Sequence, residues 1–422
     1  MKEKVWIINQ YSTTPEYPAS SRHYELAKYL SERFTVELWG SNFIHHNKKY
    51  RFSPWTLVKK EQVKPTFVIN WVGALPYKDN GISRMLNMLV FALTLLIVGI
   101  CKRDKPSVII GSSPTLFIAF SSMLLAKYRK ASFFLEVRDL WPDSLIEISG
   151  KGRNNIMVKI LLWMERTLYC NAEKIITLTE GMTPRLKAKG VCEEKLFFLP
   201  NGIDLHDTSF SSDKEERKKV RIELGASDKD IIFMYAGAHG PANDLKQIIY
   251  TAQQLRKEKN IKFVLVGEGV DKSSLIELVN ELNLSNVLFK SAVPKSQINM
   301  YLSSADAFII CLKDIPLFTD ALPNKLFDYL IQNKYIVTTV KGEIKSLLEK
   351  HKLGVYGNIK EKGENYLPDL CRCIASAIIE RKINMDGRGR QIVEEYYSRE
   401  KQAIQLANLI SRVKGEKNEQ SY

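Results

Sequence analysis

The stretch FTDALPNKLFDYLIQNK, residues 318–334, combines the residue types most suited to holding an anion. Pro323 suits the start of a helix, where its missing N–H is not needed, so Lys325 should lie in the first helical turn. A cation there adds to the positive end of the helix dipole, which is costly unless an anion such as a diphosphate is bound alongside. We therefore predict that Lys325 contacts phosphate and that Asn324 belongs to the same site.

Two carboxylates frame this helix start. Asp328 follows Lys325 by one turn, and Asp320 precedes Asp328 by eight positions. A carboxylate can accept hydrogen bonds through both oxygens, which suits two vicinal hydroxyls such as those of a ribose. We predict that role for Asp328.

A second group of charges occurs in EVRDLWPDS, residues 136–144, where a strand is expected to end. Charges gathered at a strand terminus are more often functional than solvated. Asp139 could orient an acceptor hydroxyl, and Arg138 could hold a phosphate. A structural Arg–Asp pair that fixes the turn is the alternative.

The loop after the first expected strand contains a weaker signal. A helix should begin near Ser20 or Ser21, and its free N–H groups, with Ser21 and Arg22, could bind a phosphate. Serine is also an ordinary helix N-cap, so the signal alone is not specific.

The elements that position these residues follow from short apolar runs alternating with helical patterns, which is typical of parallel βαβ units. The expected strands fall in two series: 5–8, 35–39, 107–111, 132–137, 174–179 and 195–200, then 231–237, 262–267, 286–290, 307–311 and 334–339. The fold class predicted is α/β, with two Rossmann-like doubly wound domains. Ligands of such sheets bind beyond the carboxyl ends of the strands, so the two domains should face each other across a cleft.

We expect residues 1–204 to form an acceptor-binding domain and residues 205–389 to bind a nucleotide-sugar. The polar stretch 205–227 is expected to be a linker. The segment 390–422 should supply a terminal helix, from 390 to about 414, that packs back towards the first domain, and a tail.

Charge is unevenly distributed along the chain. Residues 1–204 contain 29 Lys and Arg against 18 Asp and Glu, and the rest contains 33 against 29. The excess predicts an anionic partner for the first half, either a lipid surface or nucleic acid. Residues 85–101 have no charged side chain and form either a core helix or a helix whose apolar face enters a membrane interface.

The six cysteines show no metal-ligand spacing, and residues 1–10 read as a strand and not as a signal peptide. No metal site is predicted, and a cytoplasmic protein, peripheral at the inner face of the membrane, is expected.

Together these segments resemble glycosyltransferase family 4, along nearly the whole chain. The resemblance is carried by AEKIITLTEGM (172–182), LPNGID (199–204), LVGEG (265–269) and the Asp320-x7-Asp328 pair, in the place of the family's E-x7-E. RDLWPD (138–143) and PNKLFDYL (323–330) resemble a bacterial O-antigen or capsule branch that includes L-fucosamine transferases. The resemblance implies a GT-B fold and a retaining, metal-independent sugar transfer from a nucleotide-sugar, expected to be UDP-linked, to a lipid-linked saccharide.

The resemblance also implies residue roles. Asp328 would bind the ribose and Asp320 would face the transferred sugar, although both are one methylene shorter than glutamate. The segment from Ser291 to Val293 would meet the base, and Gly237 and Gly240 would border the phosphates. The family's Arg and Lys after the first strand of the second domain are replaced here by Ala238 and Asn243. Lys325, Arg22 or Arg138 must then balance the diphosphate.

Two other functions stay open on the sequence. A nucleotide-sugar epimerase of similar build would need no acceptor site. A basic nucleic-acid-binding protein is suggested by the net charge of +15 alone, but no RNA- or DNA-binding motif supports it. No nucleic-acid partner is therefore expected.

Overall fold

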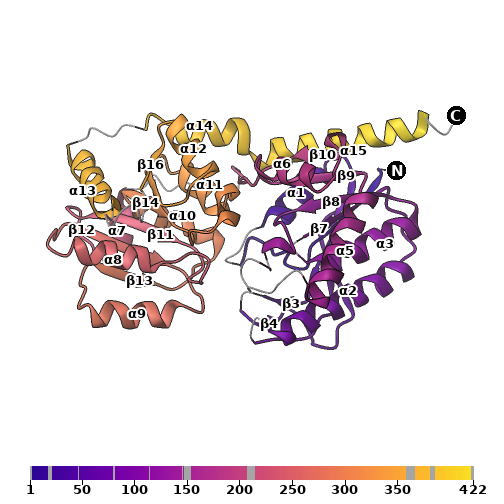
Figure 1. Cartoon of the computed structure of the whole chain (residues 1–422), viewed down its shortest axis with the longest axis horizontal. Coiled ribbons are helices and arrows are strands. Elements are labelled where there is room, and N and C mark those ends of the chain that lie inside the picture. Colours follow the sequence, from indigo (N-terminus) through magenta and orange to yellow (C-terminus); the bar gives the residue numbers. More distant parts are fainter. Residues whose placement is uncertain are drawn as a thin grey trace. The chain divides into compact units, whose positions relative to one another are not determined.

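The computed structural model describes residues 2–17, 21–45, 47–78, 81–113, 115–144, 146, 154–206, 214–357, 366–380 and 385–419. Ser20 and part of the expected linker lie outside these ranges. The chain forms two compact units (Figure 1). Unit 1 comprises residues 1–14, 19–201 and 399–422, and unit 2 comprises residues 15–18 and 202–398.

Unit 1 contains an eight-stranded sheet of order β10-β9-β8-β7-β1-β2-β6-β5, parallel except for the last pair. Its strands are β1 (Lys4–Ile8), β2 (Thr35–Ser41), β5 (Val58–Lys64), β6 (Phe67–Val72), β7 (Val108–Ser112), β8 (Ser132–Val137), β9 (Lys174–Thr177) and β10 (Leu196–Phe198). A hairpin of β3 (Phe43–Ile44) and β4 (Lys49–Tyr50) stands apart. The helices are α1 (Arg22–Leu30), α2 (Ile82–Cys101), α3 (Leu116–Arg129), α5 (Ile156–Asn171), α6 (Met182–Ala188) and α15 (Arg399–Glu419).

Both faces of this sheet are covered, so alternate residues of each inner strand enter different cores. On one face Trp6 and Ile8 pack with residues of α2, α3 and α5. On the other face Val5 and Ile7 pack with α1 and α15. The α15 residues in that core are Ala403, Leu406, Ala407, Leu409, Ile410 and Val413, the spacing of one apolar helix face.

Unit 2 contains a parallel six-stranded sheet of order β13-β12-β11-β14-β15-β16. Its strands are β11 (Ile231–Ala236), β12 (Ile261–Val266), β13 (Val287–Lys290), β14 (Ala307–Ile310), β15 (Tyr335–Thr338) and β16 (Gly354–Tyr356). Its helices are α7 (Lys214–Glu223), α8 (Lys246–Gln254), α9 (Lys272–Glu281), α10 (Lys295–Ser304), α11 (Asn324–Leu330), α12 (Glu343–Lys350), α13 (Tyr366–Ile379) and α14 (Arg388–Ile392).

Each sheet has a topological switch point, where successive strands stop being added on one side of the first strand and begin on its other side. The switch lies between β1 and β7 in unit 1 and between β11 and β14 in unit 2. The carboxyl ends of these strands are where open α/β sheets bind ligands. Residues that follow β1, β7, β11 and β14 are therefore the first to inspect for a site.

The structure corrects three expectations. The chain leaves unit 1 after Asn201, not after 204, and returns to it at Arg399, not at 390. The expected linker 205–227 contains α7, because Val220 is buried in the unit 2 core and Arg221 donates to Ser304 O at 2.8 Å. The helix expected from 390 to 414 is interrupted, since a π-helical turn (393–397) follows α14 and Ser398 is extended before α15.

Candidate functional site

Lys325 lies in the first turn of α11, which begins at Asn324 directly after Pro323, as the sequence predicts. Its Nζ donates to the hydroxyl of Tyr235 at 2.6 Å and to Oδ1 of Asn243 at 3.1 Å. The ammonium also lies 4.0 Å from the centroid of the Tyr235 ring. The lysine therefore points to the carboxyl end of β11, beside the topological switch of unit 2.

The ammonium of Lys325 is held by neutral groups. Burial lowers its pKa to about 8, and among the described residues no carboxylate forms an ion pair with it. Asn243, which stands where the family resemblance implies a lysine, instead accepts a hydrogen bond from Lys325. The cation at this position therefore comes from α11 and not from residue 243 of the loop after β11.

Glycines bring the loops after β11 and β12 close to this ammonium. A Cβ at Gly237 would lie 2.9 Å from Nζ of Lys325, and a Cβ at Gly267 would lie 1.9 Å from the carbonyl oxygen of Gly237. Both residues have a positive φ, 154° and 149°. A Cβ at Gly240 would have no atom within 4 Å, so the loop is open at that point.

His239, in the same loop, was not singled out from the sequence. Its side chain is buried between the rings of Tyr235 and Phe289, with centroids 6.1 Å away in each case. Neither ring nitrogen has a hydrogen-bond partner in the described structure. Burial, with the charge of Lys272, lowers the pKa of His239 to about 4, so the ring is neutral. A histidine two residues after a strand-end glycine is the signal that could have found it.

The remaining unit 2 candidates lie on separate elements. Asp328 is on α11, three residues after Lys325, and Asp320 ends the 3-10 turn Pro316–Asp320. Ser291 follows β13 and hydrogen bonds to Glu268, whereas Val293 packs against the unit 2 core. The structure brings Lys325 and Gly237 together at the carboxyl end of β11, and Asp328 lies one turn further along α11.

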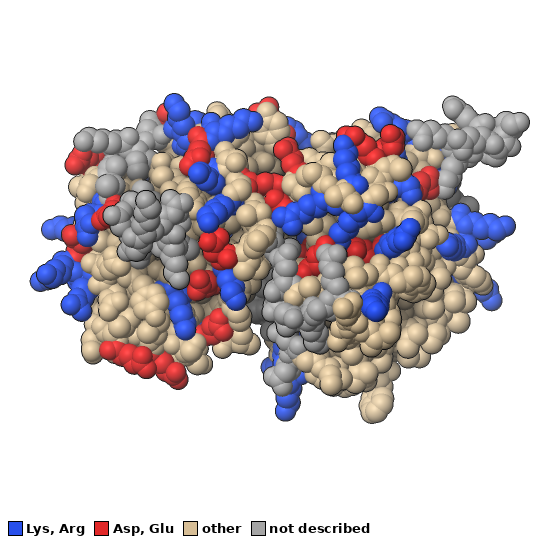
Figure 2. All heavy atoms as spheres, in the orientation of Figure 1, with Lys and Arg blue, Asp and Glu red and all other residues tan. Residues whose placement is uncertain are grey.

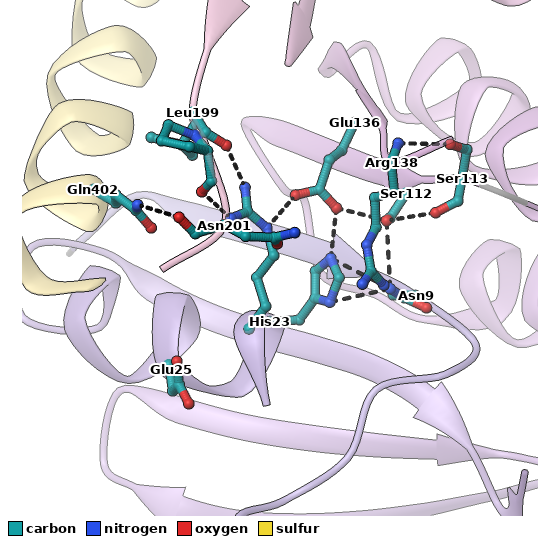
Figure 3. A network of polar contacts seen from close by, with 12 residues as sticks. Asn9, His23, Glu25, Ser112, Ser113, Glu136, Arg138, Leu199, Asn201 and Gln402 are labelled. Atoms are coloured by element: carbon teal, nitrogen blue, oxygen red, sulfur yellow. Dashed lines mark hydrogen bonds and ion pairs between the residues drawn. The ribbon is translucent and has the colours of Figure 1, made fainter. Parts of the chain in front are cut away.

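Unit 1 contains a buried polar network at its own switch point (Figure 3). Glu136, at the end of β8, accepts hydrogen bonds from Arg22 Nε at 2.8 Å and from Ser112 Oγ at 2.6 Å. Its other partner is His23 Nε2, at 2.6 Å, and Asn9 contacts the opposite ring nitrogen of His23 at 3.0 Å. Asn9 and Ser112 come directly after β1 and at the end of β7, which is the signal the sequence offered for them.

The electrostatics of this network favour an ionised Glu136. Burial raises the pKa of Glu136, but the attraction of His23 and Arg22 outweighs it and holds the pKa well below the ordinary value. Burial lowers the pKa of His23 below its ordinary value. Glu136 is therefore a carboxylate whose partners come from α1 and from the end of β7.

Two unit 1 predictions need correction. Arg22 is a fully buried side chain that also donates to the carbonyl oxygens of Leu199 and Pro200, at 2.9 and 2.5 Å, so all three of its nitrogens are directed at the protein and none is exposed to a ligand phosphate. The side chain of Ser21 contacts Glu25 and does not cap the helix. The helix start is therefore filled by the protein itself.

The loop after β8 contains the predicted residues Arg138 and Asp139, both partly exposed. The backbone N–H of Arg138 donates to Ser113 Oγ at 3.0 Å, and its Nε is buried without a hydrogen-bond partner in the described structure. Asp143, in contrast, pairs with Lys189 at 2.7 Å and belongs to another cluster.

Comparison with known families divides the chain in the same way. A glycosyl transferase 4-like domain matches residues 24–202, and a model of glycosyl transferases group 1 matches residues 216–364. A protein of Escherichia coli (strain K12), named as a colanic acid biosynthesis glycosyl transferase, WcaI, is 28% identical over 272 residues. That alignment spans 64% of this chain and 66% of the relative.

Solved structures share the whole fold. Sucrose-phosphate synthase from Thermosynechococcus elongatus superposes with a TM-score of 0.70 at 13% identity, covering 98% of this chain and 100% of that one. Anabaena Alr3699/HepE in complex with UDP and glucose gives 0.69 at 12% identity, covering 97% and 99%. The chain therefore belongs to the glycosyltransferases of GT-B fold, with its 4-like domain in unit 1 and its group 1 domain in unit 2.

Proposed function

We propose that the protein is a retaining, metal-independent glycosyltransferase that moves a sugar from a UDP-linked donor to a lipid-linked saccharide. The family membership supports sugar transfer from a nucleotide-sugar. The acceptor is proposed from the colanic acid role named for the E. coli relative and from the sequence resemblance to O-antigen and capsule enzymes. The transferred sugar proposed on that resemblance is an N-acetylated amino-deoxyhexose.

The observation that carries this proposal is the ammonium of Lys325. A partly buried cation with only neutral partners is unfavourable, because no opposite charge offsets the loss of its hydration. Its position at the start of α11 adds the positive end of a helix dipole. A donor diphosphate placed there would offset both the lost hydration of the ammonium and its repulsion by the helix dipole.

The chemistry then rests on positioning and charge. The bond between the anomeric carbon and the leaving phosphate oxygen breaks while the acceptor oxygen bonds to the same face of that carbon, and the leaving oxygen takes the acceptor's proton. Lys325 stabilises the negative charge on the diphosphate, which is the role a metal ion has in other transferases. Asp328 holds the ribose, Asp320 faces the transferred sugar, and Arg138 with Asp139 binds the acceptor.

Donor binding provides the first test. In a thermal-shift screen with UDP-, GDP- and dTDP-sugars, only the native donor should stabilise the protein, because a ligand specific to the folded state raises its melting temperature. Lys325→Met should weaken that binding by roughly 10-fold to 100-fold, the range expected for one charge-assisted contact.

Lys334→Met is the matched control. Lys334 is another lysine whose pKa is lowered by burial, to about 7, but it donates to the carbonyl oxygens of Ser303 and Ala305. Its substitution should leave donor affinity unchanged. Equal affinity of the Lys325→Met variant and the parent protein would remove Lys325 from the site.

Product analysis separates transfer from the alternatives. Release of UDP should require the lipid-linked acceptor and persist in EDTA. An isomerised nucleotide-sugar formed without acceptor would favour an epimerase instead. Salt-sensitive binding to nucleic acid without any nucleotide-sugar binding would favour a nucleic-acid-binding protein.

A further inference from the structure

Three helices of unit 1, α2, α3 and α5, cover one face of its sheet, and their outer sides are unusually apolar. Their inner sides enter a single core with Trp6 and Ile8 of the sheet. The helix α3 lies between the other two: Leu125 approaches Gly99 of α2, and Phe120 contacts the Trp163 ring of α5 with centroids 5.6 Å apart. The three helices form a continuous layer (Figure 1).

The outer side of α2 carries a narrow apolar stripe. Its exposed residues are Ile82, Leu86, Leu93, Ile97 and Ile100, with Leu93 and Ile97 60% and 63% exposed. Steps of four, seven, four and three residues return to nearly the same helix face. Eighteen residues at 1.5 Å each make the stripe about 27 Å long.

The other two helices extend this surface. On α5 the exposed apolar residues are Ile156, Ile160 and Trp163, again at helical steps of four and three, and Trp163 is 59% exposed. On α3 they are Leu124 and Tyr128. From the sequence, an apolar face at a membrane interface was one of two alternatives for residues 85–101, and none was considered for α3 or α5.

Charge on this surface has one sign. The three helices contain a single acidic residue, Glu165, which is buried and accepts hydrogen bonds from Tyr169 and Lys189. Their exposed basic residues are Lys127, Lys159 and Arg166, and Arg103, Lys105 and Lys130 follow the helix ends. Figure 2 shows the surface over these helices mostly uncharged, with scattered basic side chains. Such a surface suits an anionic partner.

The helix α2 is fixed in the fold and cannot leave it to cross a bilayer. It meets the length and hydropathy of a membrane span, but one third of it is buried. The side chain of Gln10 donates to Asn87 at 2.6 Å, and Asn87 in turn contacts the carbonyl of Leu75. Arg129 of α3 donates to the carbonyl oxygens of Gly99 and Ile100, at 2.8 and 2.9 Å.

We propose that the outer surface of α2, α3 and α5 is a monotopic membrane-binding face that lies in the headgroup layer of an anionic phospholipid bilayer. Its apolar stripes and Trp163 enter the acyl boundary, and its basic side chains contact lipid phosphates. A second copy of the chain is a poorer occupant, because two basic surfaces repel each other. This proposal rests on the proposed lipid-linked acceptor and names the surface that brings the enzyme to it.

The test uses the full-length protein and vesicles of phosphatidylcholine, alone or with 30% phosphatidylglycerol. The protein should sediment with the anionic vesicles at low salt, and several-fold less with neutral vesicles or at high salt. The double variant Ile97→Ser/Trp163→Ser should bind at least tenfold more weakly. Ile222→Ser/Ile379→Ser, which alters two exposed isoleucines of unit 2, should bind as the parent does.

A second readout locates the contact. Acyl-brominated lipids should quench part of the tryptophan emission of the parent protein, and Trp163→Phe should lose that part while still binding. Unchanged sedimentation of the Ile97/Trp163 variant, quenching that survives Trp163→Phe, or a dimer that this variant abolishes would each overturn the proposal.

The outcomes separate this proposal from the proposed function. Stabilisation by a UDP-sugar should be the same in the parent and in Ile97→Ser/Trp163→Ser, because the substitutions are in unit 1 and Lys325 is in unit 2. Vesicle binding without any effect of a nucleotide-sugar would contradict the transferase and leave the membrane-binding face intact. Stabilisation by a nucleotide-sugar without any vesicle binding would contradict only the membrane-binding face.

Discussion

At the scale of single residues, two partly buried lysines in unit 2, Lys325 and Lys334, differ in what surrounds them. Lys334 donates to backbone carbonyls that need a donor, so its role is explained by the fold. Lys325 has a tyrosine hydroxyl and an asparagine oxygen, which any neutral donor could satisfy. The fold gains little from a charge at position 325, and this is the physical reason to connect it with a ligand.

The lowered pKa of Lys325 predicts a pH dependence. Because its pKa is about 8 in the free protein, UDP affinity should fall as the pH rises through 8, when the ammonium is lost. Calorimetric titration of UDP between pH 6.5 and 9.5 measures this. Lys325→Arg, whose guanidinium stays charged, should show a flatter profile. A parent affinity that does not change over this range would contradict the assignment.

The lowered pKa of Lys325 also predicts that stability depends on pH, in the opposite direction to UDP affinity. The folded pKa lies below the unfolded value of 10.5, so the unfolded state binds more protons between pH 8 and 10.5. Stability should therefore rise with pH across that window, and Lys325→Met should stabilise the protein at pH 7 by on the order of 2 kcal/mol. Urea unfolding of the parent and variant at pH 7 and 9.5 compares the two; a variant less stable than the parent at pH 7 would show that the ammonium serves the fold.

The sequence correctly predicted that Lys325 lies in the first turn of a helix, because the pattern that predicts it is local. Pro323 sets the helix start two residues before it, and no distant contact is needed to infer the first turn. Arg22 was misassigned because its partners are distant: Glu136 is 114 positions away and Leu199 is 177. A helix start seen in the sequence does not reveal what already fills it.

At the scale of elements, most of the buried strands were predictable and the exposed edge was not. Inner parallel strands are mostly apolar because both of their faces are covered, and all but one were expected from an apolar run. The exception is β6, FVINWV, a buried inner strand that the sequence analysis did not predict. The antiparallel edge strand β5, VKKEQVK, is mostly exposed and lacks that signal. Its charged residues suit an edge that must not pair with another molecule.

The terminal helix shows a different limit. Its apolar spacing is continuous with that of the residues before it, so the sequence indicated one helix from 390. The structure interrupts it at Ser398, where the extended chain forms a bridge with Ile203 and then leaves unit 2. Such a break depends on a partner almost 200 residues away and leaves no local pattern.

The ion pair that attaches α15 to α1 can be tested by mutation. Arg399 and Glu25 form a buried pair, with Nε 2.9 Å from Oε2. Arg399→Ala leaves that carboxylate without its cation, which should cost about 3–5 kcal/mol of unfolding free energy. Urea unfolding followed by circular dichroism measures it, with the exposed Arg412→Ala as a control that should change little. Equal midpoints for the two variants would show that the pair does not anchor the helix.

At the scale of the whole molecule, the end of the chain belongs to the unit that contains its beginning. The chain leaves unit 1 after Asn201 and returns at Arg399, and the residues of α15 complete the core around Val5 and Ile7. Unit 1 is thus built from segments on both sides of unit 2, so its core cannot be complete until α15 has been synthesised. Unit 2 between the two crossings is nearly continuous.

The division of tryptophan between the units has a practical consequence. All six tryptophans precede Asn201, and Trp6, Trp39 and Trp71 are fully buried in unit 1. Intrinsic fluorescence therefore reports the melting of one half of the molecule, whereas far-ultraviolet dichroism reports both. Multidomain chains need not unfold in one step. A UDP-sugar held by unit 2 should then delay the dichroism signal more than the fluorescence signal, and coincident curves with and without nucleotide would instead reveal that the two halves melt as one.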